Sequence, residues 1–232
     1  MIDWSAIDTV LLDMDGTLLD LHFDNYFWLT HLPRRYAEQQ GLCPDAATQQ
    51  LRQRFHDKRG TLDWYCLDYW SRELAVDVRA LKEEIQHLIA ERPHAIDFLQ
   101  KLKSAGKRRV LVTNAHPQSL ELKLSLTAIG DHLDLIISSH HYGVPKESPL
   151  FWQALERDIG FDGATTLFID DSEAILAAAQ RFGISQLCCI RQPDSRLEAS
   201  YRGQFPAIHH FDEIIPEALA TGAEPGTGVA GG

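Results

Sequence analysis

A run of apolar residues that ends in two carboxylates constrains this chain more than any other stretch. Residues 9–12 read Thr-Val-Leu-Leu, Asp13 and Asp15 follow one residue apart, and Gly16 breaks the extended pattern. Such a run, bounded by turn residues, predicts a buried strand with carboxylates at its C-terminal end. Alternate strand residues share a face, so Asp13 and Asp15 project together and repel each other. A bound cation or a shared proton relieves that repulsion, unless the pair is a solvated turn.

The composition places the chain among globular proteins. It has 232 residues, of which 44% are hydrophobic and 24% charged, enough for one sizeable core and a smaller second unit. The net charge of -11, with no run of lysine or arginine, argues against a nucleic acid polymer as partner. A small phosphate ester is still compatible, because a metal ion and one lysine can offset its charge locally.

Cysteine spacing and the N-terminus bear on metal binding and location. The four cysteines show no C-x-x-C spacing, so we interpret them as reduced thiols, with a zinc site as the minor alternative. The N-terminus lacks the pattern of a signal peptide, and no apolar run approaches membrane-spanning length. These features predict a cytoplasmic protein without a membrane partner. The sequence carries no signal for the oligomeric state.

The segment after the first strand changes character and predicts a helical insertion. Residues 21–92 are rich in aromatic, charged and histidine residues and contain no β-branched runs. Four helices are expected there, at 25–40, 45–57, 62–74 and 78–90. We therefore divide the chain into an α/β core made of 1–20 and 93–221, a helical cap at 21–92, and a disordered tail at 222–232.

From residue 93 onward helices and strands alternate. Strands are expected at 109–114, 134–139, 165–171 and 186–190. Helices are expected at 94–105, from Pro117 to just before Gly130, at 149–159, from Ser172 to Gly183, and at 212–220. Strands that alternate with helices form parallel sheets, so the fold class is α/β.

Polar residues follow most of these strands, where ligands gather in parallel α/β sheets. The residues that this rule brings to one edge are Asp13, Asp15, Thr113, Asn114, Lys146, Asp170 and Asp171. Such a recurrence outweighs the interpretation of each carboxylate pair as a solvated turn. Four carboxylates with one lysine form a site of hard oxygen ligands, which favours Mg²⁺ over zinc.

These residue types suit the hydrolysis of a phosphate monoester. Asp13 would attack phosphorus and form an aspartyl-phosphate, while Asp15 would protonate the leaving alcohol and later deprotonate water. Thr113 and Asn114 would hold phosphoryl oxygens, although simple helix capping is their alternative role. Lys146 would offset negative charge, although most lone lysines are solvated. His116 could line the mouth of the site, but an ordinary turn histidine is the commoner case.

The ordered set Asp13-Met14-Asp15-Gly16-Thr17, Thr113-Asn114, Lys146 and Asp170-Asp171 resembles the four motifs of the haloacid dehalogenase superfamily. The resemblance implies a Rossmann-like core with a cap inserted after the first strand. It also implies that Mg²⁺ binds Asp13, the main-chain carbonyl of Asp15, and Asp171, with Asp170 as the open alternative to Asp171. Members that dehalogenate lack the second aspartate of D-x-D, so Asp15 favours phosphate chemistry.

Longer stretches resemble bacterial nucleotidases that act on GMP and IMP, which implies a purine nucleoside 5'-monophosphate as the small-molecule substrate. The stretches are 11–21, 24–28, 62–70 and 113–117. The rival functions are a sugar phosphomutase, a phosphatase of another small phosphomonoester, and a non-enzymatic phosphate-binding module.

Substrate selection is expected to depend on residues just beyond the first strand. His22, Asp24 and Asn25 are candidates to contact sugar or base, with helix capping as the alternative for Asp24. The aromatic segment 64–70 has roughly helical spacing, so we expect its rings in the core of the cap rather than stacked on the base.

Overall fold

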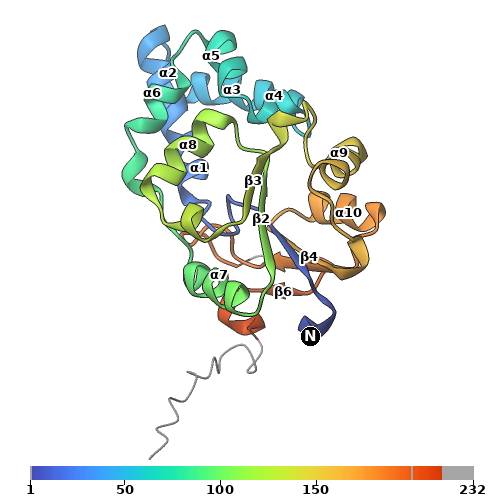
Figure 1. Ribbon diagram of the computed structural model, residues 1–232. Helices are drawn as coiled ribbons and strands as arrows, with labels where there is room; N and C mark the ends of the chain where they lie inside the picture. The colour runs from blue at the N-terminus through green and yellow to red at the C-terminus, as the bar shows by residue number, and fades with distance from the viewer. Residues whose placement is uncertain (1, 200, 216–232) are drawn as a thin grey trace, which may run out of the picture.

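The computed structural model describes residues 2–199 and 201–215, and in this part of the chain six parallel strands form one sheet (Figure 1). The strands are β1 (Thr9–Leu12), β2 (Arg108–Thr113), β3 (Leu135–Ser138), β4 (Thr166–Asp170), β5 (Gln186–Ile190) and β6 (Ala207–Ile208). Their order is β3-β2-β1-β4-β5-β6, which confirms the α/β fold class with a parallel sheet. The central strand β1 pairs on both sides, Leu11 lying opposite Val110 and Phe168.

Helices cover both faces of the sheet. On one face α7 (Ala95–Ser104) packs against Leu12, Leu111 and Ile169, and α8 (Pro117–Leu126) adds partly buried leucines. On the other face α9 (Pro149–Ile159) and α10 (Glu173–Phe182) pack against Leu11 and Val112. Neighbouring strand residues thus enter opposite cores, which explains why the strands are apolar throughout.

The ends of these helices follow capping rules. Ser148 caps α9 by accepting a hydrogen bond from Leu150 N–H, Pro149 occupies its first turn, and Gly160 follows its end. Gly183 adopts φ +116° after α10, a conformation that favours glycine. The prediction for α8 was wrong at its end, because the helix stops at Leu126 and Gly130 lies in a separate 3₁₀ turn, Ile129–His132.

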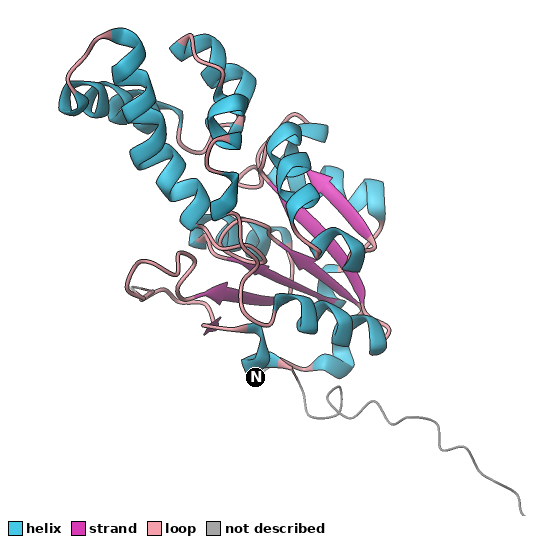
Figure 2. Cartoon of the chain, turned by 90° about the vertical axis from the view of Figure 1, so that its left-hand side faces the viewer, coloured by secondary structure: helices cyan, strands magenta, loops and turns pink. Residues whose placement is uncertain are grey.

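The insertion between β1 and α7 consists of α1 (His22–Tyr26), a π-helical turn (Phe27–His31), α2 (Leu32–Gln40), α3 (Pro44–Lys58), α4 (Leu62–Tyr65), α5 (Leu67–Leu74), α6 (Val78–Glu83) and a 3₁₀ turn (Gln86–Leu88). These helices lie together at the top of Figure 1 and the upper left of Figure 2. They enclose a hydrophobic cluster built from residues 23–85, which includes Phe27 and Trp70. The division at 21 and 92 stays a prediction.

Several expected elements differ. The helix expected at 62–74 breaks at Cys66, whose backbone is extended, because Cys66 caps the following helix instead of continuing the first one. The helix expected at 78–90 ends at Glu83. The two-residue strand β6 carries too short a pattern to be predicted. At the start of the helix expected at 212–220 the structure has a 3₁₀ turn, Phe211–Ile214, and residues 216–220 and the tail at 222–232 lie outside the described residues.

The described part of the chain contains no helix with both the length and the apolar character needed to cross a membrane. All four cysteines are free thiols, as expected.

Candidate active site

The C-terminal ends of β1, β2 and β4 bring the polar residues together. Asp13 directly follows β1, and its N–H donates to the carbonyl of Ile169 at 3.0 Å, which continues the pairing with β4. The chain then turns at Gly16, with φ +82°. A Cβ on Gly16 would lie 2.7 Å from Oδ2 of Asp171, so only glycine lets this loop approach the second carboxylate pair.

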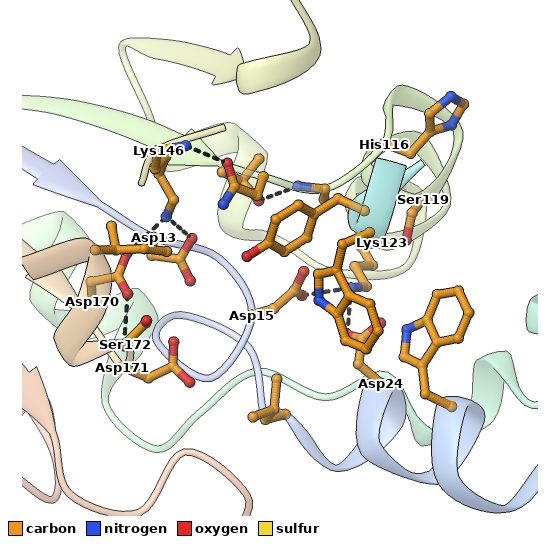
Figure 3. A pocket seen from close by; sticks show the side chains of 18 of the residues that line it. Asp13, Asp15, Asp24, His116, Ser119, Lys123, Lys146, Asp170, Asp171 and Ser172 are labelled. Atoms are coloured by element: carbon orange, nitrogen blue, oxygen red, sulfur yellow. Dashed lines mark hydrogen bonds and ion pairs between the residues drawn. The ribbon is translucent and has the colours of Figure 1, made fainter. Parts of the chain in front are cut away.

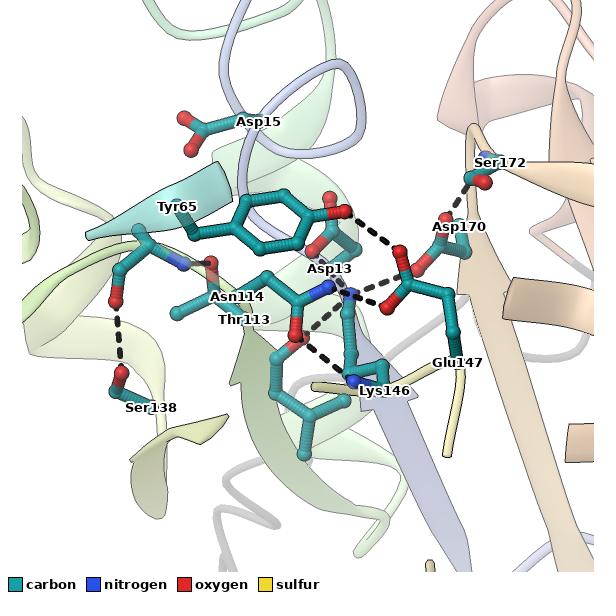
Figure 4. Close-up of polar contacts among 12 residues, drawn as sticks. Asp13, Asp15, Tyr65, Thr113, Asn114, Ser138, Lys146, Glu147, Asp170 and Ser172 are labelled. Atoms are coloured by element: carbon teal, nitrogen blue, oxygen red, sulfur yellow. Dashed lines mark hydrogen bonds and ion pairs between the residues drawn. The ribbon is translucent and has the colours of Figure 1, made fainter. Parts of the chain in front are cut away.

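Lys146 joins two of the carboxylates (Figure 4). Its Nζ donates to Oδ1 of Asp13, to Oδ2 of Asp170 at 2.7 Å, and to the carbonyl of Val112 at 3.0 Å. The side chain is buried, and burial alone would lower its pKa, but Asp13 and Asp170 raise the pKa above the ordinary value. Lys146 is therefore a fixed positive charge rather than a solvated loop lysine.

Three carboxylates form a cluster with the chemistry of a cation site. Oxygen atoms of Asp13, Asp170 and Asp171 lie within 4.8 Å of one another. Burial, opposed by Lys146 and reinforced by Asp170, raises the pKa of Asp13 to about 6, and burial with the neighbouring Asp170 and Asp13 raises that of Asp171 well above its ordinary value. The negative charge exceeds what one lysine offsets. A donor set made only of carboxylate oxygens fits a hard divalent cation such as Mg²⁺.

The residues after β2 are held by a polar network. Asn114 Oδ1 accepts the backbone N–H of Lys146 at 2.9 Å, and its Nδ2 donates to Glu147 at 3.0 Å. From the insertion, the hydroxyl of Tyr65 donates to the same Glu147 at 2.7 Å. Thr113 Oγ1 accepts the N–H of Ala115 at 3.0 Å, and neither Thr113 nor Asn114 caps α8, because His116 does.

A second charged chain extends from Asp15 into the insertion (Figure 3). Lys123 Nζ donates to Oδ1 of Asp15 and to Oδ2 of Asp24, both at 2.6 Å, and Lys82 Nζ donates to the other oxygen of Asp24 at 2.7 Å. Burial alone would raise the pKa of Asp24, but Lys123 and Lys82 together hold it below its ordinary value. Burial raises the pKa of Asp15 to about 6 against the opposing charge of Lys123.

Sequence reasoning missed both of these lysines. Lys82 follows Val78 by four residues and precedes Ile85 by three, and Lys123 follows Leu120 by three. Each therefore lies on the apolar face of its helix, where a charged side chain needs an ion partner. A lysine on the apolar face of a predicted helix was therefore the sequence signal that could have identified both residues.

A cavity of about 260 Å³ lies above these groups. Its lining combines the polar residues of the sheet edge with Trp28, Trp64, Tyr65 and Leu67 of the insertion. The aromatic segment thus divides, since Trp70 is buried in the insertion's core whereas Trp64 and Tyr65 face the cavity.

The other candidate residues take different places. Asp24, Asn25 and His116 line the cavity, and Asp24 is ion-paired rather than a helix cap, since α1 begins after Leu21. The amide of Asn25 donates to Asp194 at 2.8 Å. His22 is not among the described lining residues, and its Nδ1 lies 3.5 Å from the carboxylate of Asp194.

Comparisons with known proteins agree with this architecture. The family model of haloacid dehalogenase-like hydrolases matches residues 7–183. The chain is 45% identical over 218 residues to the GMP/IMP nucleotidase YrfG of Escherichia coli, covering 94% of this chain and 98% of that protein. It is 24% identical over 208 residues to the (S)-2-haloacid dehalogenase 4A of Burkholderia cepacia, with 83% and 86% covered.

Among solved structures, a HAD phosphatase from Thermococcus onnurineus superposes with a TM-score of 0.73 at 23% identity, covering 89% of this chain and 95% of that one. The match to the family model spans most of the chain and includes the strand ends that carry Asp13, Thr113 and Asp170. The chain belongs to the haloacid dehalogenase-like hydrolases.

Proposed function

We propose that this hydrolase is a Mg²⁺-dependent 5'-nucleotidase that releases phosphate from purine nucleoside monophosphates such as GMP and IMP. The observation that carries the proposal is the cavity itself, whose floor holds Asp13, Lys146 and Asp170 and whose roof holds the rings of Trp28 and Trp64. The similarity to an enzyme named for GMP and IMP supports the choice of substrate.

In the proposed reaction, a carboxylate oxygen of Asp13 attacks phosphorus and the bond to the nucleoside 5'-oxygen breaks. Asp15 gives its proton to that oxygen, so a neutral nucleoside leaves. Asp15 then takes a proton from water, which attacks the aspartyl-phosphate and frees Asp13 and inorganic phosphate. A pKa of about 6 at Asp15 allows it to serve as both acid and base near neutral pH.

The remaining residues position the phosphate. Thr113 and the amide of Asn114 supply neutral donors at the end of β2, and Lys146 offsets charge as phosphorus is attacked. Asp13, Asp171 and the carbonyl of Asp15 would hold Mg²⁺, with Asp170 held by Lys146 as the alternative to Asp171. When bound, the ion supplies positive charge against the phosphoryl oxygens.

The insertion would act as a cap that selects the leaving group. Trp28 and Trp64 present nearly parallel rings, with centroids 6.2 Å apart and planes inclined by 22°. Both line the cavity, so a planar purine can contact an aromatic face there. The cap also excludes water from the reacting groups.

A panel of phosphomonoesters with Mg²⁺ tests the proposal. We expect kcat/KM for GMP and IMP to exceed that for pyrimidine nucleotides and sugar phosphates, with nucleoside and phosphate formed in equal amounts. Isomerisation of a sugar phosphate without phosphate release would instead identify a mutase, which is the second candidate function. If the protein turns over no phosphomonoester, the hydrolase proposal is wrong and a non-enzymatic phosphate-binding module becomes the better interpretation.

Removal of the metal should stop turnover. EDTA removes the cation that offsets the negative charge of Asp13, Asp170 and Asp171, and these carboxylates then repel the phosphate of the substrate. We therefore expect activity to fall to background and Mg²⁺ to restore it. Phosphate release is measured before and after addition. EDTA that is saturated with Mg²⁺ beforehand is the control and should have no effect. Full activity after chelation would contradict the metal-dependent mechanism.

Replacement of Lys123 should impair the acid/base step. Lys123→Met removes the positive charge next to Asp15, so the pKa of Asp15 rises further and the carboxylate loses its orientation. We expect kcat to fall about tenfold or more. Since Asp15 must be protonated to act as the acid, the alkaline limb of the kcat profile should move to higher pH. Lys103→Met, an exposed position on α7, is the control. A lower kcat with an unshifted profile would contradict this role.

A further inference from the structure

A second group of metal-ligating side chains lies away from the carboxylates. Ligand atoms of Cys66, His116 and His140 lie within 4.8 Å of one another. They come from three places: Cys66 lies between α4 and α5 of the insertion, His116 precedes α8, and His140 lies in the 3₁₀ turn Ser139–His141 after β3. The cluster therefore joins the insertion to the sheet domain.

The two imidazoles lie against each other, and His140 offers a ring nitrogen that is free within the described part of the chain. The Nε2 atom of His140 is buried and has no hydrogen-bond partner among the described residues. The rings of His116 and His140 lie 5.0 Å apart and nearly perpendicular, at 86°. A metal ion binds the neutral form of imidazole, and Nε2 of His116 becomes available when the ring proton moves to Nδ1, which releases the long 3.4 Å contact with the N–H of Gln118.

The third ligand and a nearby carboxylate complete the donor set. The Sγ of Cys66 accepts the N–H of Tyr69 at 3.4 Å, so the sulfur is held at the start of α5. Oδ2 of Asp68 lies 3.7 Å from Nε2 of His116, so this carboxylate is close enough to serve as a further ligand. A thiolate and two imidazoles suit zinc, whereas the carboxylate centre suits Mg²⁺.

We propose that Cys66, His116 and His140 bind one zinc ion that fastens the insertion to the sheet domain. The neighbouring Tyr65 already contacts Glu147 across the same boundary, so the ion reinforces an existing contact. If the proposed function holds, a fastened cap blocks substrate entry and product release, and zinc inhibits turnover. The binding of zinc does not depend on that function.

Cobalt binding tests the site directly. Co²⁺ is titrated into metal-free protein with excess Mg²⁺, which occupies the carboxylate centre. We expect one ion per chain with a thiolate-to-cobalt charge-transfer band, lost on addition of Zn²⁺. Cys66→Ser keeps an acceptor for Tyr69 N–H but should abolish the band. His140→Ala removes a direct ligand and should weaken binding by more than the roughly 10–100-fold that loss of an outer partner costs.

Matched controls distinguish this site from the others. Cys43→Ser and His141→Ala alter an exposed cysteine and an exposed histidine, and both should keep the band. Asp13→Asn should also keep it, because the carboxylate centre is not involved. Absence of the band in the unaltered protein, or its survival in Cys66→Ser, would overturn the proposal.

The activity assay addresses the inhibition separately. Zn²⁺ added in the presence of saturating Mg²⁺ should inhibit the unaltered protein and not Cys66→Ser. A cobalt band without inhibition by zinc would support the metal site and overturn its fastening role. Absence of phosphatase activity altogether would count against the proposed function, while the spectroscopic result would stand by itself.

Discussion

Replacing Asp13 with asparagine is expected to reduce turnover by roughly 10⁴-fold or more, the scale seen when a nucleophile is removed. An amide cannot attack phosphorus as a carboxylate does, so no aspartyl-phosphate forms. The fold should survive for two reasons. The change removes a buried negative charge that Asp170 repels, and Lys146 keeps its ion pair with Asp170. The measurements are kcat with the best phosphomonoester and thermal unfolding by circular dichroism.

A control for this change lies on the same segment. Asp8→Asn alters an exposed carboxylate just before β1 and should leave kcat unchanged. Acid quenching during turnover should trap phosphate on the unaltered protein and not on Asp13→Asn. Turnover that persists in the correctly folded variant would exclude covalent catalysis by Asp13.

Replacing Lys146 with methionine should cost both activity and stability. The side chain is buried and is the ion partner of two buried carboxylates, Asp13 and Asp170. Without Lys146 these charges lack their ion partner, and breaking a buried ion pair typically costs about 3–5 kcal/mol. We expect the free energy of unfolding in urea to fall on that scale without added Mg²⁺, and kcat to fall to background.

The loss of stability in Lys146→Met should depend on pH. The pKa of Asp13 is already raised in the folded protein from 3.8 to about 6, and removal of Lys146 raises it further. A raised folded pKa means that the folded state binds the proton more tightly than the unfolded chain, so stability falls as pH rises above 3.8. The variant should therefore lose more stability at pH 8 than at pH 5.

Lys103→Met again serves as the matched control, because Lys103 is exposed on α7 and should change stability little at either pH. Equal stability of Lys146→Met and the unaltered protein at pH 8 would contradict the role of Lys146 as the counter-charge of the buried carboxylates.

The local pattern of the chain was enough to predict most of the strands of the sheet and the helices that cover it. Strand β5 has the expected limits of 186–190, and α9 begins after Ser148 and ends before Gly160 as expected. These elements can be predicted from local sequence patterns, namely apolar runs, capping residues and glycines. The rule that ligands gather at the carboxyl ends of parallel strands was enough to place Asp13, Thr113 and Asp170 at one edge, because it needs only the order of the elements.

The insertion between β1 and α7 was less predictable. The helix expected at 62–74 is broken at Cys66, and the aromatic segment splits between the core and the cavity. Both outcomes depend on which neighbours surround each ring and each backbone group, and these neighbours come from distant parts of the sequence. Helical periodicity alone cannot tell a ring that faces a core from one that faces a cavity.

The sequence by itself determined the strand, its D-x-D-G turn and the carboxylates at the sheet edge, because these follow from residue types a few positions apart. Only the tertiary structure decided the partners of Asp15, since Lys123 lies 108 residues further along the chain. The same holds for the cluster of Cys66, His116 and His140, which no spacing in the sequence records. Contacts between distant residues form only when the insertion packs against the helices and loops of the sheet, so the chemistry of these contacts cannot be seen in the sequence alone.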